Sequence, residues 1–498
     1  MPRTGQQYID GLRDGRAVYI DGQRVEDVTT HPAFRQAVRS VARLYDLAAD
    51  PANADVMLAD SPYGEAPINV AHMIPRSKAD LEHRQGGLRR WSESTFGLMG
   101  RSPDHVAGFF AGFAGNAGVF ARAGQEYADN VVNFHKKMCR EDLYLAYVIV
   151  PPQIDRSKPA HQQADPHLYA GVKAERDGGI VIQGAQMLGT GMALADYVHL
   201  STIFPLRPGD ENYAISLAVP VGTPGVKVHS RRGYAAGATS TFDYPLSSQF
   251  DETDSLVVFD DVFVPWENVF VYRDLDLVQA QWWETPAHIL GNNQAQVRFA
   301  TKLDFLTGLA HRVAAMNGVA ELPPVRGTLG ELAAHATLVS GLVHGAVQNC
   351  TIDEYGVARP GHAESYANMT LQSEVYPKVL GMVRELCGGG LIQLPSSVED
   401  FRSEDVAATI ETYIQSPGVA AVDRVKLLKL VWDLVGSEFA SRHVQYEMFY
   451  AGAPFVVKMR MFQNYDFDQA DALVESALER YDLDGVKDRA AAVEPSGA

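Results

Sequence analysis

The spacing of apolar residues changes twice along the chain. Up to residue 143 the spacing is mostly helical. One series of apolar residues recurs every three or four positions within 35–48; its members are Val38, Val41, Leu44 and Leu47. Another series follows Thr4 and predicts a further helix; its members are Tyr8, Leu12 and Val18. We therefore expect a helical N-terminal part.

Between residues 144 and 275 the period changes to two, which is typical of strands. The turn signal Asp177-Gly178-Gly179 separates two such runs. Further strands are predicted at 198–204, 213–219, 226–230 and 256–271. The last of these is apolar on both faces in its middle, so we expect it to be buried on both sides. This part of the chain is expected to be an antiparallel β-domain.

From residue 276 to residue 498 helical spacing returns. One apolar stripe stops near Asn317-Gly318; it consists of Phe299, Leu303, Leu306, Ala310 and Val313. Pro323-Pro324 is expected to break the chain before a helix that opens at Thr328 and runs to about Cys350. Later helices are predicted at 365–386, 425–435 and 470–481.

This order of elements favours an α+β fold with three domains. They are a helical N-terminal domain at 1–143, a β-domain at 144–275, and a C-terminal helical bundle with its tail at 276–498. The length of 498 residues is sufficient for two or three domains with large cores.

Composition limits the class of protein. Hydrophobic residues are 46% and charged residues 21%, which is ordinary for a globular protein. The net charge of −18 argues against nucleic acid and anionic membrane surfaces as partners. The sequence shows no signal-peptide core and no apolar run as long as a bilayer span, so a soluble cytoplasmic protein is expected. The wide spacing of Cys139, Cys350 and Cys387 suggests neither a disulfide framework nor a metal site.

Two loops of the middle part are candidates for a ligand site. The apolar run after Tyr144 ends at Pro151 and Pro152, where the backbone leaves regular structure. A second run ends in Gly189-Thr190-Gly191, where glycines allow close approach of a flat ligand and a hydroxyl can point at it. The two loops together could form a slot for a planar cofactor. The sequence contains no P-loop, zincin or serine-hydrolase motif, and its glycines do not extend to a dinucleotide fingerprint.

Six strings in the sequence resemble the oxygenase components of the 4-hydroxyphenylacetate 3-monooxygenase family, which are two-component phenol monooxygenases that use reduced flavin. The strings are GLMGRSPD at 97–104, LYLAYVIVPPQIDRSKPA at 143–160, DYPLSSQFDETDS at 243–255, VPWENVFVYRD at 264–274, VKLLKLVWDLVGSEF at 425–439 and YAG at 450–452. They follow in order across nearly the whole chain, so the resemblance is specific at family level.

The resemblance implies a fold and an assembly. The fold is acyl-CoA dehydrogenase-like, with a helical N-terminal domain, a middle β-barrel domain for flavin and substrate, and a C-terminal four-helix bundle. Such proteins usually assemble as homotetramers through the bundle.

The resemblance also implies an activity. A separate flavin reductase supplies FAD as FADH2, O2 adds to the flavin, and the resulting C4a-hydroperoxide transfers one oxygen to the ortho carbon of a phenolic small molecule. The protein then has to exclude water and to polarise the phenol toward phenolate. Whether the substrate is free or tethered to a carrier protein is left open, as is the identity of the reductase.

Three catalytic residues are implied by the resemblance: Arg101, His105 and Tyr147. Arg101 lies just before a predicted helix, with Ser102 as N-cap and Pro103 as the first helical residue. Relatives usually carry Tyr at the position of His105 and often His at the position of Tyr147. The two polar types are thus exchanged, so the base and the donor would approach the substrate from different sides.

Flavin contacts are implied at seven positions: Gln153, Asp155, Arg156, Thr190, Tyr450, Ala451 and Gly452. At the last three positions the resemblance implies a contribution from a neighbouring subunit. For Arg156 the structural alternative is an ion pair with Asp155. Gln294 stands where dehalogenating and denitrating relatives carry a His, which favours plain hydroxylation over removal of a ring substituent.

Three other functions compete with this one. A radical dehydratase similar to 4-hydroxybutyryl-CoA dehydratase would need clustered thiolate ligands for an iron–sulfur cluster, and the three cysteines do not fall at that family's positions. An acyl-CoA dehydrogenase would keep oxidised FAD and a carboxylate base in the bundle, and the monooxygenase strings argue against it. A non-catalytic flavin-binding or carrier-binding module is the third alternative.

Overall fold

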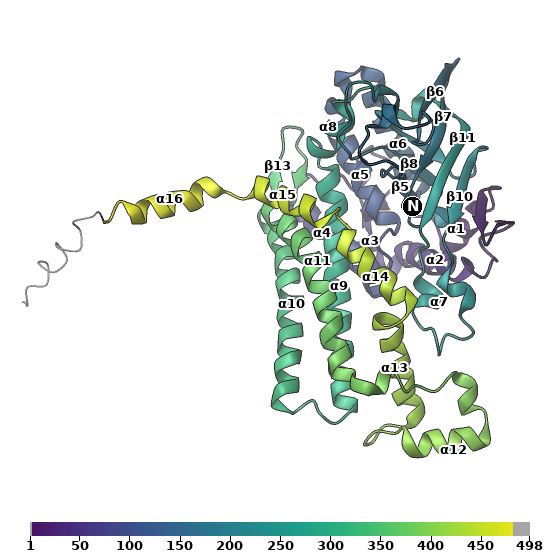
Figure 1. Cartoon of the computed structure of the whole chain (residues 1–498). Coiled ribbons are helices and arrows are strands. Elements are labelled where there is room, and N and C mark those ends of the chain that lie inside the picture. The colour runs from purple at the N-terminus through teal and green to yellow at the C-terminus, as the bar shows by residue number, and fades with distance from the viewer. Residues whose placement is uncertain (1, 482–498) are drawn as a thin grey trace, which may run out of the picture.

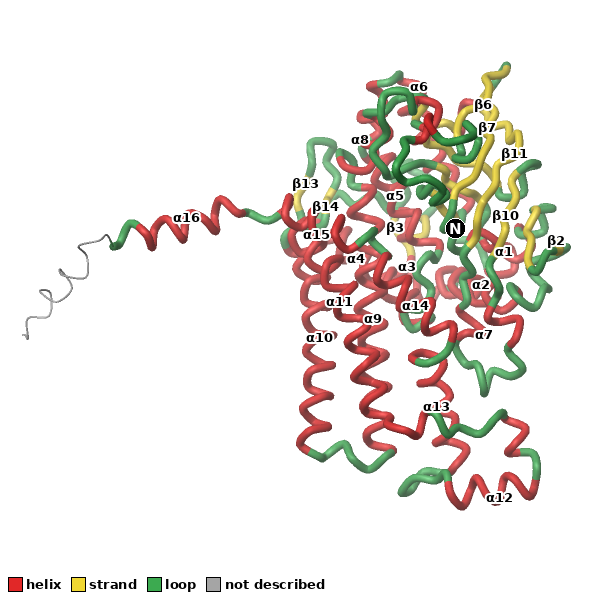
Figure 2. The backbone as a smooth tube through the Cα atoms, viewed as in Figure 1, coloured by secondary structure: helices red, strands yellow, loops and turns green. Residues whose placement is uncertain are grey.

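The computed structural model describes residues 2–481, in which long helices lie beside a part rich in β-strands (Figure 1). Most strands gather on one side of the molecule, and the long C-terminal helices run along the other (Figure 2). The coarse expectation of a mixed fold, with helices before and after a β-rich part, is confirmed.

The N-terminal part is mainly helical but also contains strands. Its elements are α1 (Gly5–Gly11), β1 (Ala17–Ile20), β2 (Gln23–Val25), α2 (Arg35–Ala49), α3 (Ala54–Met57), β3 (Leu58–Ala59), β4 (Ile68–Asn69), α4 (Lys78–Ser94), α5 (Pro103–Gly115) and α6 (Gln125–Glu141). The expected extension of the first helix to Val18 is wrong. Gly15 adopts a φ of 79° beyond the end of α1, and Val18 belongs to β1. Because β1 pairs in parallel with β10, the N-terminal part contributes strands to the middle sheet.

The middle part forms two separate sheets, and the described residues contain no closed barrel. Its elements are β5 (Leu145–Val148), β6 (Gly171–Arg176), β7 (Gly179–Gln186), β8 (Tyr197–Leu200), β9 (Ile215–Pro220), β10 (Val226–Ser230), α7 (Ser247–Phe250), β11 (Ser255–Pro265) and β12 (Val269–Tyr272). One sheet has the order β2-β1-β10-β11-β7-β6 and the other β12-β9-β8-β5. Each sheet ends in strands that pair on one side only, so the expected barrel is corrected to two open sheets.

The expectation for 256–271 also needs correction. This stretch is divided between β11 in the large sheet and β12 in the small one, with a 3-10 turn between them. Along β11 buried and exposed residues alternate, and Leu256 and Phe263 are 40% and 39% exposed. The continuous apolar run therefore does not reflect burial on both faces. The turn predicted at Asp177–Gly179 is confirmed, since it connects β6 to β7.

The C-terminal part is helical, as expected. Its elements are α8 (Leu277–Trp283), α9 (Ala287–Met316), α10 (Pro323–Gln348), β13 (Thr351–Ile352), β14 (Ala358–Arg359), α11 (His362–Cys387), α12 (Glu404–Tyr413), α13 (Ala421–Val435), α14 (Glu438–Phe449), α15 (Pro454–Asn464) and α16 (Phe467–Leu478). The break expected at Pro323-Pro324 is wrong, because these prolines open α10. A proline in the first turn removes no helical hydrogen bond.

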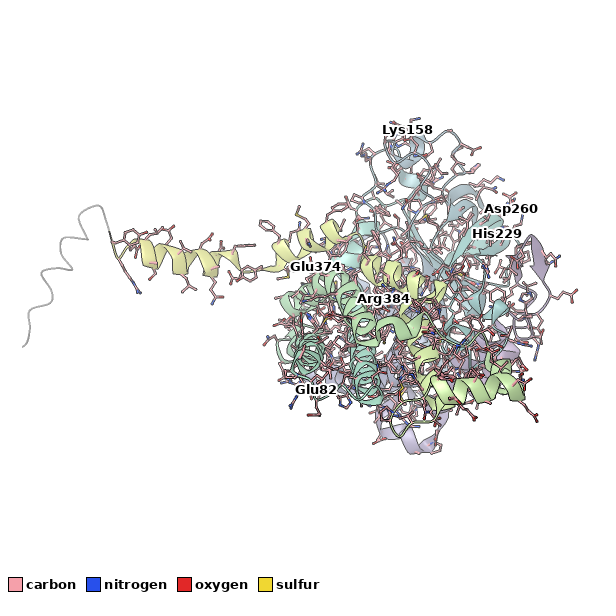
Figure 3. All side chains as sticks on the ribbon, turned by 60° about the horizontal axis from the view of Figure 1, so that its bottom comes forward. Glu82, Lys158, His229, Asp260, Glu374 and Arg384 are labelled. Atoms are coloured by element: carbon pink, nitrogen blue, oxygen red, sulfur yellow. The ribbon has the colours of Figure 1, made fainter. Side chains whose placement is uncertain are left out.

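Helices α9, α10 and α11 pack against one another, and α14 packs on α11 (Figure 1). Helix α15 also lies on α11, whereas α16 points away from the molecule and contains no buried residue. Figure 3 shows the side chains of α16 projecting outward with no other element beside them. Residues 482–498, which the expected C-terminal domain includes, lie outside the described part.

Glycine allows α5 to lie close to α9. A Cβ at Gly112 would come within 2.4 Å of the backbone nitrogen of Ala287, and one at Gly108 within 3.1 Å of that of Gly291. Side chains at these positions would push the two helices apart. This close packing places the beginning of α5, with Arg101 and His105, against the first half of α9.

Candidate active site

Arg101 is the centre of a buried cluster that also contains His105, Tyr147 and Tyr450. Its Nη1 lies 3.0 Å from Nε2 of His105, and its Nη2 donates to the backbone oxygen of Tyr450 at 3.2 Å. The guanidinium carbon lies 3.8 Å from the ring centre of Tyr450 and 5.1 Å from that of Tyr147, both within cation–π range. The structure thus brings together the three expected catalytic residues and one expected flavin residue.

The backbone of Arg101 is fixed from two sides. Its N–H donates to Oε1 of Glu252 at 2.6 Å, and its carbonyl accepts from the hydroxyl of Tyr144 at 2.6 Å. Helix α5 begins two residues later, with Ser102 at the N-cap and Pro103 as the first helical residue, as expected. The Ser102 hydroxyl donates to Oδ1 of Asp104 at 2.5 Å, and its oxygen accepts no hydrogen bond from a helix N–H. Ser102 therefore orders Asp104 and does not cap the helix through its side chain.

The charge of Arg101 has no carboxylate partner on its side chain within residues 2–481. Burial lowers the pKa of Arg101, but Tyr147, Tyr446, Tyr450 and Glu252 outweigh burial and raise the pKa above its ordinary value. One carboxylate oxygen of Glu252 accepts from the backbone N–H of Arg101, and the other lies 3.6 Å from Nη1 of Arg442. The guanidinium therefore stays charged and faces neutral acceptors and aromatic rings.

His105 is neutral in this environment. Its Nδ1 lies 3.1 Å from Oε1 of Gln294, and its ring is buried. Burial, and then the positive charge of Arg101, lower the pKa of His105 well below its usual range. His105 can accept a hydrogen bond from Arg101 while it remains uncharged.

Tyr147 closes the cluster on strand β5. Its ring centre lies 5.5 Å from that of His105 and 5.4 Å from that of Phe109. The side chain is half-buried, and its hydroxyl forms no hydrogen bond with any described residue. Tyr147 is thus a candidate donor to a ligand.

The two candidate flavin loops start side by side. Val150, just before the two prolines, forms a β-bridge with Met187, two residues before Gly189. Gln153 and Arg156 are exposed, and Asp155 forms an ion pair with Lys158 at 3.2 Å. The alternative pairing of Asp155 with Arg156 is not formed.

Thr190 is buried and tied to a network of charged residues. Its hydroxyl donates to Oδ1 of Asp254 at 2.7 Å, and Asp254 also accepts from Arg231 and Arg442. Gly191 has a φ of 73°, and a Cβ there would lie 2.4 Å from the hydroxyl of Tyr144. Since Tyr144 bonds the Arg101 carbonyl, this loop packs directly under the Arg101 cluster.

Tyr450 follows the end of α14 and is anchored by its hydroxyl, which donates to the carbonyl of Gly100 at 2.5 Å. Burial raises the pKa of Tyr450 to about 12, so its phenol stays protonated. Ala451 is half-buried, and the exposed Gly452 has a φ of 111°. Of the seven expected flavin residues, Tyr450 and Thr190 thus lie at the Arg101 cluster, and the others lie on more exposed segments.

Four residues that hold the cluster together were not predicted from the sequence: Asp104, Glu252, Arg442 and Tyr446. Asp104 and Glu252 lie within two of the strings that carry the family resemblance, at 97–104 and 243–255. Their place in these strings was the signal that could have identified them. Arg442 and Tyr446 lie on one face of α14, four positions apart, and Arg442 lies over the Tyr446 ring at 4.0 Å.

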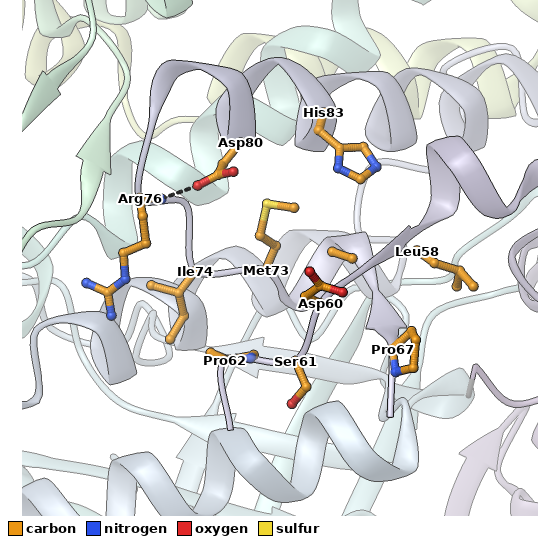
Figure 4. Close-up of a pocket in the computed structure, with 11 residues that line it drawn as sticks. Leu58, Asp60, Ser61, Pro62, Pro67, Met73, Ile74, Arg76, Asp80 and His83 are labelled. Carbon is orange, nitrogen blue, oxygen red and sulfur yellow. Dashed lines mark hydrogen bonds between the residues drawn. The ribbon is translucent and has the colours of Figure 1, made fainter. Parts of the chain in front are cut away.

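A separate pocket of about 620 Å³ opens between the β3–β4 hairpin and α4 (Figure 4). Its lining includes Asp60, Asp80, His83 and Arg76, but none of the expected site residues. The two carboxylates make it a poor site for a phenolate or a flavin phosphate. Within residues 2–481 no helix is long and apolar enough to cross a membrane, and no His, Cys, Asp and Glu group is arranged to hold a metal ion.

Comparison with known proteins gives consistent matches along the chain. The family model described as 4-hydroxyphenylacetate 3-hydroxylase N terminal matches residues 4–271, and the one described as its C terminal matches residues 278–479. The 4-hydroxyphenylacetate 3-monooxygenase oxygenase component of Pseudomonas aeruginosa is 36% identical, over 97% of this chain and 94% of that protein.

Two further relatives carry information on ligands. A Streptomyces globisporus protein is 35% identical, over 97% of this chain and 92% of that protein. It is named as a monooxygenase of a (3S)-3-amino-3-(3-chloro-4-hydroxyphenyl)propanoyl group on a peptidyl-carrier protein. A crystal structure of a 4-hydroxyphenylacetate 3-monooxygenase oxygenase component, complexed with FAD and 4-hydroxyphenylacetate, superposes with a TM-score of 0.91 at 31% identity. The superposition covers 96% of this chain and 98% of that one.

Proposed function

The chain belongs to the 4-hydroxyphenylacetate 3-hydroxylase family, and on that premise we propose that it is the oxygenase component of a two-component phenol monooxygenase. It hydroxylates a phenolic aromatic ring at the ortho position. A separate reductase supplies FADH2, and O2 is the co-substrate.

The buried guanidinium of Arg101 is the observation that carries this function. It is charged, lies among three tyrosine rings, and has no carboxylate on its side chain within the described residues. An anionic oxygen is the natural partner for such a charge. A phenol bound there is held toward phenolate, which makes its ortho carbon more electron-rich and a better acceptor of oxygen.

The other two residues assist Arg101 in different ways. His105 accepts from Nη1 and so fixes the direction of the guanidinium fork. The Tyr147 hydroxyl, which has no partner among the described residues, donates to the phenol oxygen from the side of strand β5. In relatives these residue types stand at the opposite positions, and in this chain Tyr147, not His105, supplies the donor to the phenol oxygen.

The residues of the two loops fit a flavin. Leu188 and Ile154 are 55% and 52% exposed, and Leu188 is held at a φ of 62°, which is strained for a branched residue. These apolar side chains, beside a buried hydroxyl at Thr190 and an exposed cation at Arg156, suit a planar ring system with a phosphate tail. When bound, reduced FAD supplies the electrons that activate O2. The residues proposed to hold it are Gln153, Asp155, Arg156, Thr190, Tyr450, Ala451 and Gly452.

The assembly is proposed to be a homotetramer through the C-terminal helices. Helix α16 exposes Phe467, Leu473, Val474 and Leu478, and an isolated helix of 12 residues is not stable in water. A second copy of the chain that covers this helix accounts for both facts. Removal of residues 465–498 is then expected to reduce the mass measured by light scattering, and an unchanged mass contradicts this role for α16.

We also propose that the fold is acyl-CoA dehydrogenase-like, that the domain limits lie at 143 and 275, and that the protein is cytoplasmic. The substrate is proposed to be a phenol with a 4-substituent, as in the relatives, either free or on a carrier protein. A radical dehydratase and a non-catalytic flavin-binding module are not favoured, because relatives that cover nearly the whole chain are oxygenase components.

The test is an assay of phenols with a generic flavin reductase, NADH and FAD, in which the products are identified by mass. A product that gains one oxygen atom, derived from isotopically labelled O2, supports the proposal. If FADH2 is consumed and every free or carrier-bound phenol is recovered unchanged, the proposed function is wrong. Protein that purifies saturated with oxidised FAD and keeps it on dialysis would contradict a diffusible FADH2.

A further inference from the structure

A chain of three hydrogen bonds runs from Arg101 through His105 and Gln294 to Asp104. Nη1 of Arg101 lies 3.0 Å from Nε2 of His105, and Nδ1 of His105 lies 3.1 Å from Oε1 of Gln294. Nε2 of Gln294 donates to Oδ1 of Asp104 at 3.1 Å. All four residues are buried, with exposures of 8% for Arg101 and 1–2% for the others. Water is therefore a poor substitute for any of these partners.

The donor and the acceptor of every hydrogen bond in this chain follow from the two end residues, Arg101 and Asp104. A guanidinium has only donors, so Nε2 of His105 has to accept and its proton has to be on Nδ1. Oε1 of Gln294 accepts a hydrogen bond from this N–H. The amide nitrogen of Gln294 is thereby directed at the carboxylate of Asp104. Asp104 also accepts from the Ser102 hydroxyl, and it completes the chain as the final acceptor. While Asp104 is ionised, the four groups are consistent only in this arrangement.

We propose that Gln294 is a positioning residue that fixes His105 as its Nδ1–H tautomer and so aims the Arg101 guanidinium at the phenol oxygen. In the other tautomer an N–H of His105 would face the N–H of Arg101, and the fork would have to turn away. The hydrogen bonds within residues 2–481 use two of the five N–H donors of the fork, and the tautomer of His105 decides which donors are left for a ligand. This inference rests on the proposed function.

Asp104 anchors the far end of the chain and is influenced by several elements. Arg84 on α4 faces it, Gln294 approaches it from α9, and Tyr144 approaches it from just before β5. Burial raises the pKa of Asp104 to about 6, against the effects of Ser102, Arg84 and Gln294. A protonated Asp104 can donate to the Gln294 amide and thereby permit it to turn over. Control of the tautomer is thus strongest above this pH.

The experiment uses 4-nitrophenol as the probe, because its phenolate absorbs visible light and its phenol does not. The full-length protein is titrated with the probe from pH 5 to pH 9, with and without FAD, and the flavin spectrum is subtracted. The apparent pKa and the Kd of the bound probe are measured for the parent protein, Gln294→Met and Gln294→Glu. Methionine keeps the volume of the side chain but has neither the acceptor nor the donor. Glutamate, sharing one proton with Asp104 at low pH, keeps both.

A positioning role predicts a particular ranking of the variants. At pH 6, Gln294→Glu is expected to bind the phenolate almost as the parent does. Gln294→Met is expected to raise the apparent pKa of the bound probe by about one unit and to weaken binding about tenfold. A merely structural role predicts the opposite order, since a buried apolar isostere is tolerated better than an added carboxylate. Thermal stability of both variants is recorded beside the binding data.

The outcomes separate the two proposals. If the parent protein binds the probe as phenolate and Gln294→Met does so equally well, the positioning role of Gln294 is wrong and the proposed function stands. If the parent protein neither binds nor ionises the probe, with or without FAD, the site does not recognise phenolate and both proposals fail.

Discussion

Two buried polar clusters meet at the ring of Tyr450. Arg101 lies 3.8 Å from its centre and Arg298 lies 4.8 Å from it. Both clusters are buried, and each contains an arginine and a histidine. The histidine is His105 in the Arg101 cluster and His443 in the Arg298 cluster, where its Nδ1 lies 3.0 Å from Nζ of Lys302. Burial lowers the pKa of both histidines well below the usual range, so both are neutral. They differ in how the positive charge is neutralised, and that difference separates a structural ion pair from a ligand site.

The Arg298 cluster is closed. Glu447 on α14 accepts from both terminal nitrogens of Arg298 and from Nζ of Lys302, each at 2.7 Å, and from Gln372 at 2.6 Å. The side chains of the ion pairs are 0% exposed. With four donors around one carboxylate, the positive charges of Arg298 and Lys302 already have a counter-charge in the fold.

The Arg101 cluster is open. Its guanidinium has a histidine, a backbone carbonyl and aromatic rings as partners, and the nearby Glu252 is used by the backbone of Arg101 and by Arg442. Burial of a charge without a counter-ion is costly. We therefore propose that Glu447 contributes to stability and that Arg101 is kept for an anionic ligand.

Loss of the carboxylate in the closed cluster is expected to have the largest effect. Glu447→Gln leaves Arg298 and Lys302 buried without a counter-charge, and we expect the free energy of unfolding to fall by about 3–5 kcal/mol. The measurement is thermal and urea unfolding at fixed protein concentration. Glu438→Gln on the same helix is the matched control. That side chain is 68% exposed and 3.6 Å from Arg232, so its loss costs at most about 1 kcal/mol. Similar losses in the two variants would contradict the comparison.

The two clusters should also respond to acid in opposite directions. Burial alone raises the pKa of Glu447, but Arg298 and Lys302 outweigh it and lower the pKa to about 2 from 4.5. The unfolded chain then takes up the proton first, so stability from Glu447 is lost as the pH falls from 4.5 toward 2, by about 3 kcal/mol. The pKa of Asp104 is raised to about 6 from 3.8, so its folded form takes up the proton first. Stability linked to Asp104 is gained as the pH falls from 6 toward 3.8.

Thermal unfolding of the parent, Glu447→Gln and Asp104→Asn between pH 3 and pH 7 checks these signs. Glu447→Gln should lose part of the acid-induced fall in Tm. Asp104→Asn should lose the stability that protonation of Asp104 adds below pH 6, so its Tm should fall more steeply with acid than that of the parent. Parallel pH curves for all three proteins would contradict the assignment of opposite shifts.

Removal of the charge in the open cluster is expected to affect turnover and not stability. Arg101→Met should lower kcat/KM for the phenol about 100-fold, which is about 3 kcal/mol. Tm should be unchanged or higher, because an unpaired buried charge is removed. Arg101→Lys keeps the charge but not the fork and should lie between the two. The measurement is product and peroxide per FADH2 consumed. A fall in Tm as large as that of Glu447→Gln would make Arg101 a structural residue instead.

Local features of the fold could be predicted from the sequence, because they depend on neighbours in the chain. The stripe from Phe299 to Val313 ends with α9 near Asn317, and Ser102-Pro103 opens α5. The pairing of β1 with β10 could not be predicted, since nothing near either strand specifies a partner about 200 residues away. The two open sheets were missed for the same reason.

The candidate site was predictable only in part. Arg101 lies two residues before α5 and His105 lies in its first turn, and a motif identifies them. Gln294 reaches them from α9, and Tyr450, 349 positions from Arg101 in the chain, reaches them from the end of α14. The pairing of donors and acceptors depends on how closely α5 packs against α9. A sequence pattern carries no information on the distance between the two helices.

The smallest expected effect is that of the Tyr147 hydroxyl, and it tests how far the open cluster extends. Tyr147→Phe keeps the ring that lies 5.5 Å from His105 and 5.1 Å from Arg101, so packing and the cation–π contact are preserved. The hydroxyl has no partner among the described residues, and Tm should not change. If it donates to the phenol oxygen, kcat/KM should fall about fivefold, which corresponds to about 1 kcal/mol for a neutral hydrogen bond. Tyr19→Phe is the matched control, because Tyr19 is also half-buried and stacks on a histidine ring, at 4.9 Å from His229, far from the cluster. If kcat/KM is equal in Tyr147→Phe and Tyr19→Phe, the open cluster is limited to Arg101 and the hydrogen-bonded chain of His105, Gln294 and Asp104. A loss confined to Tyr147→Phe extends the site to strand β5.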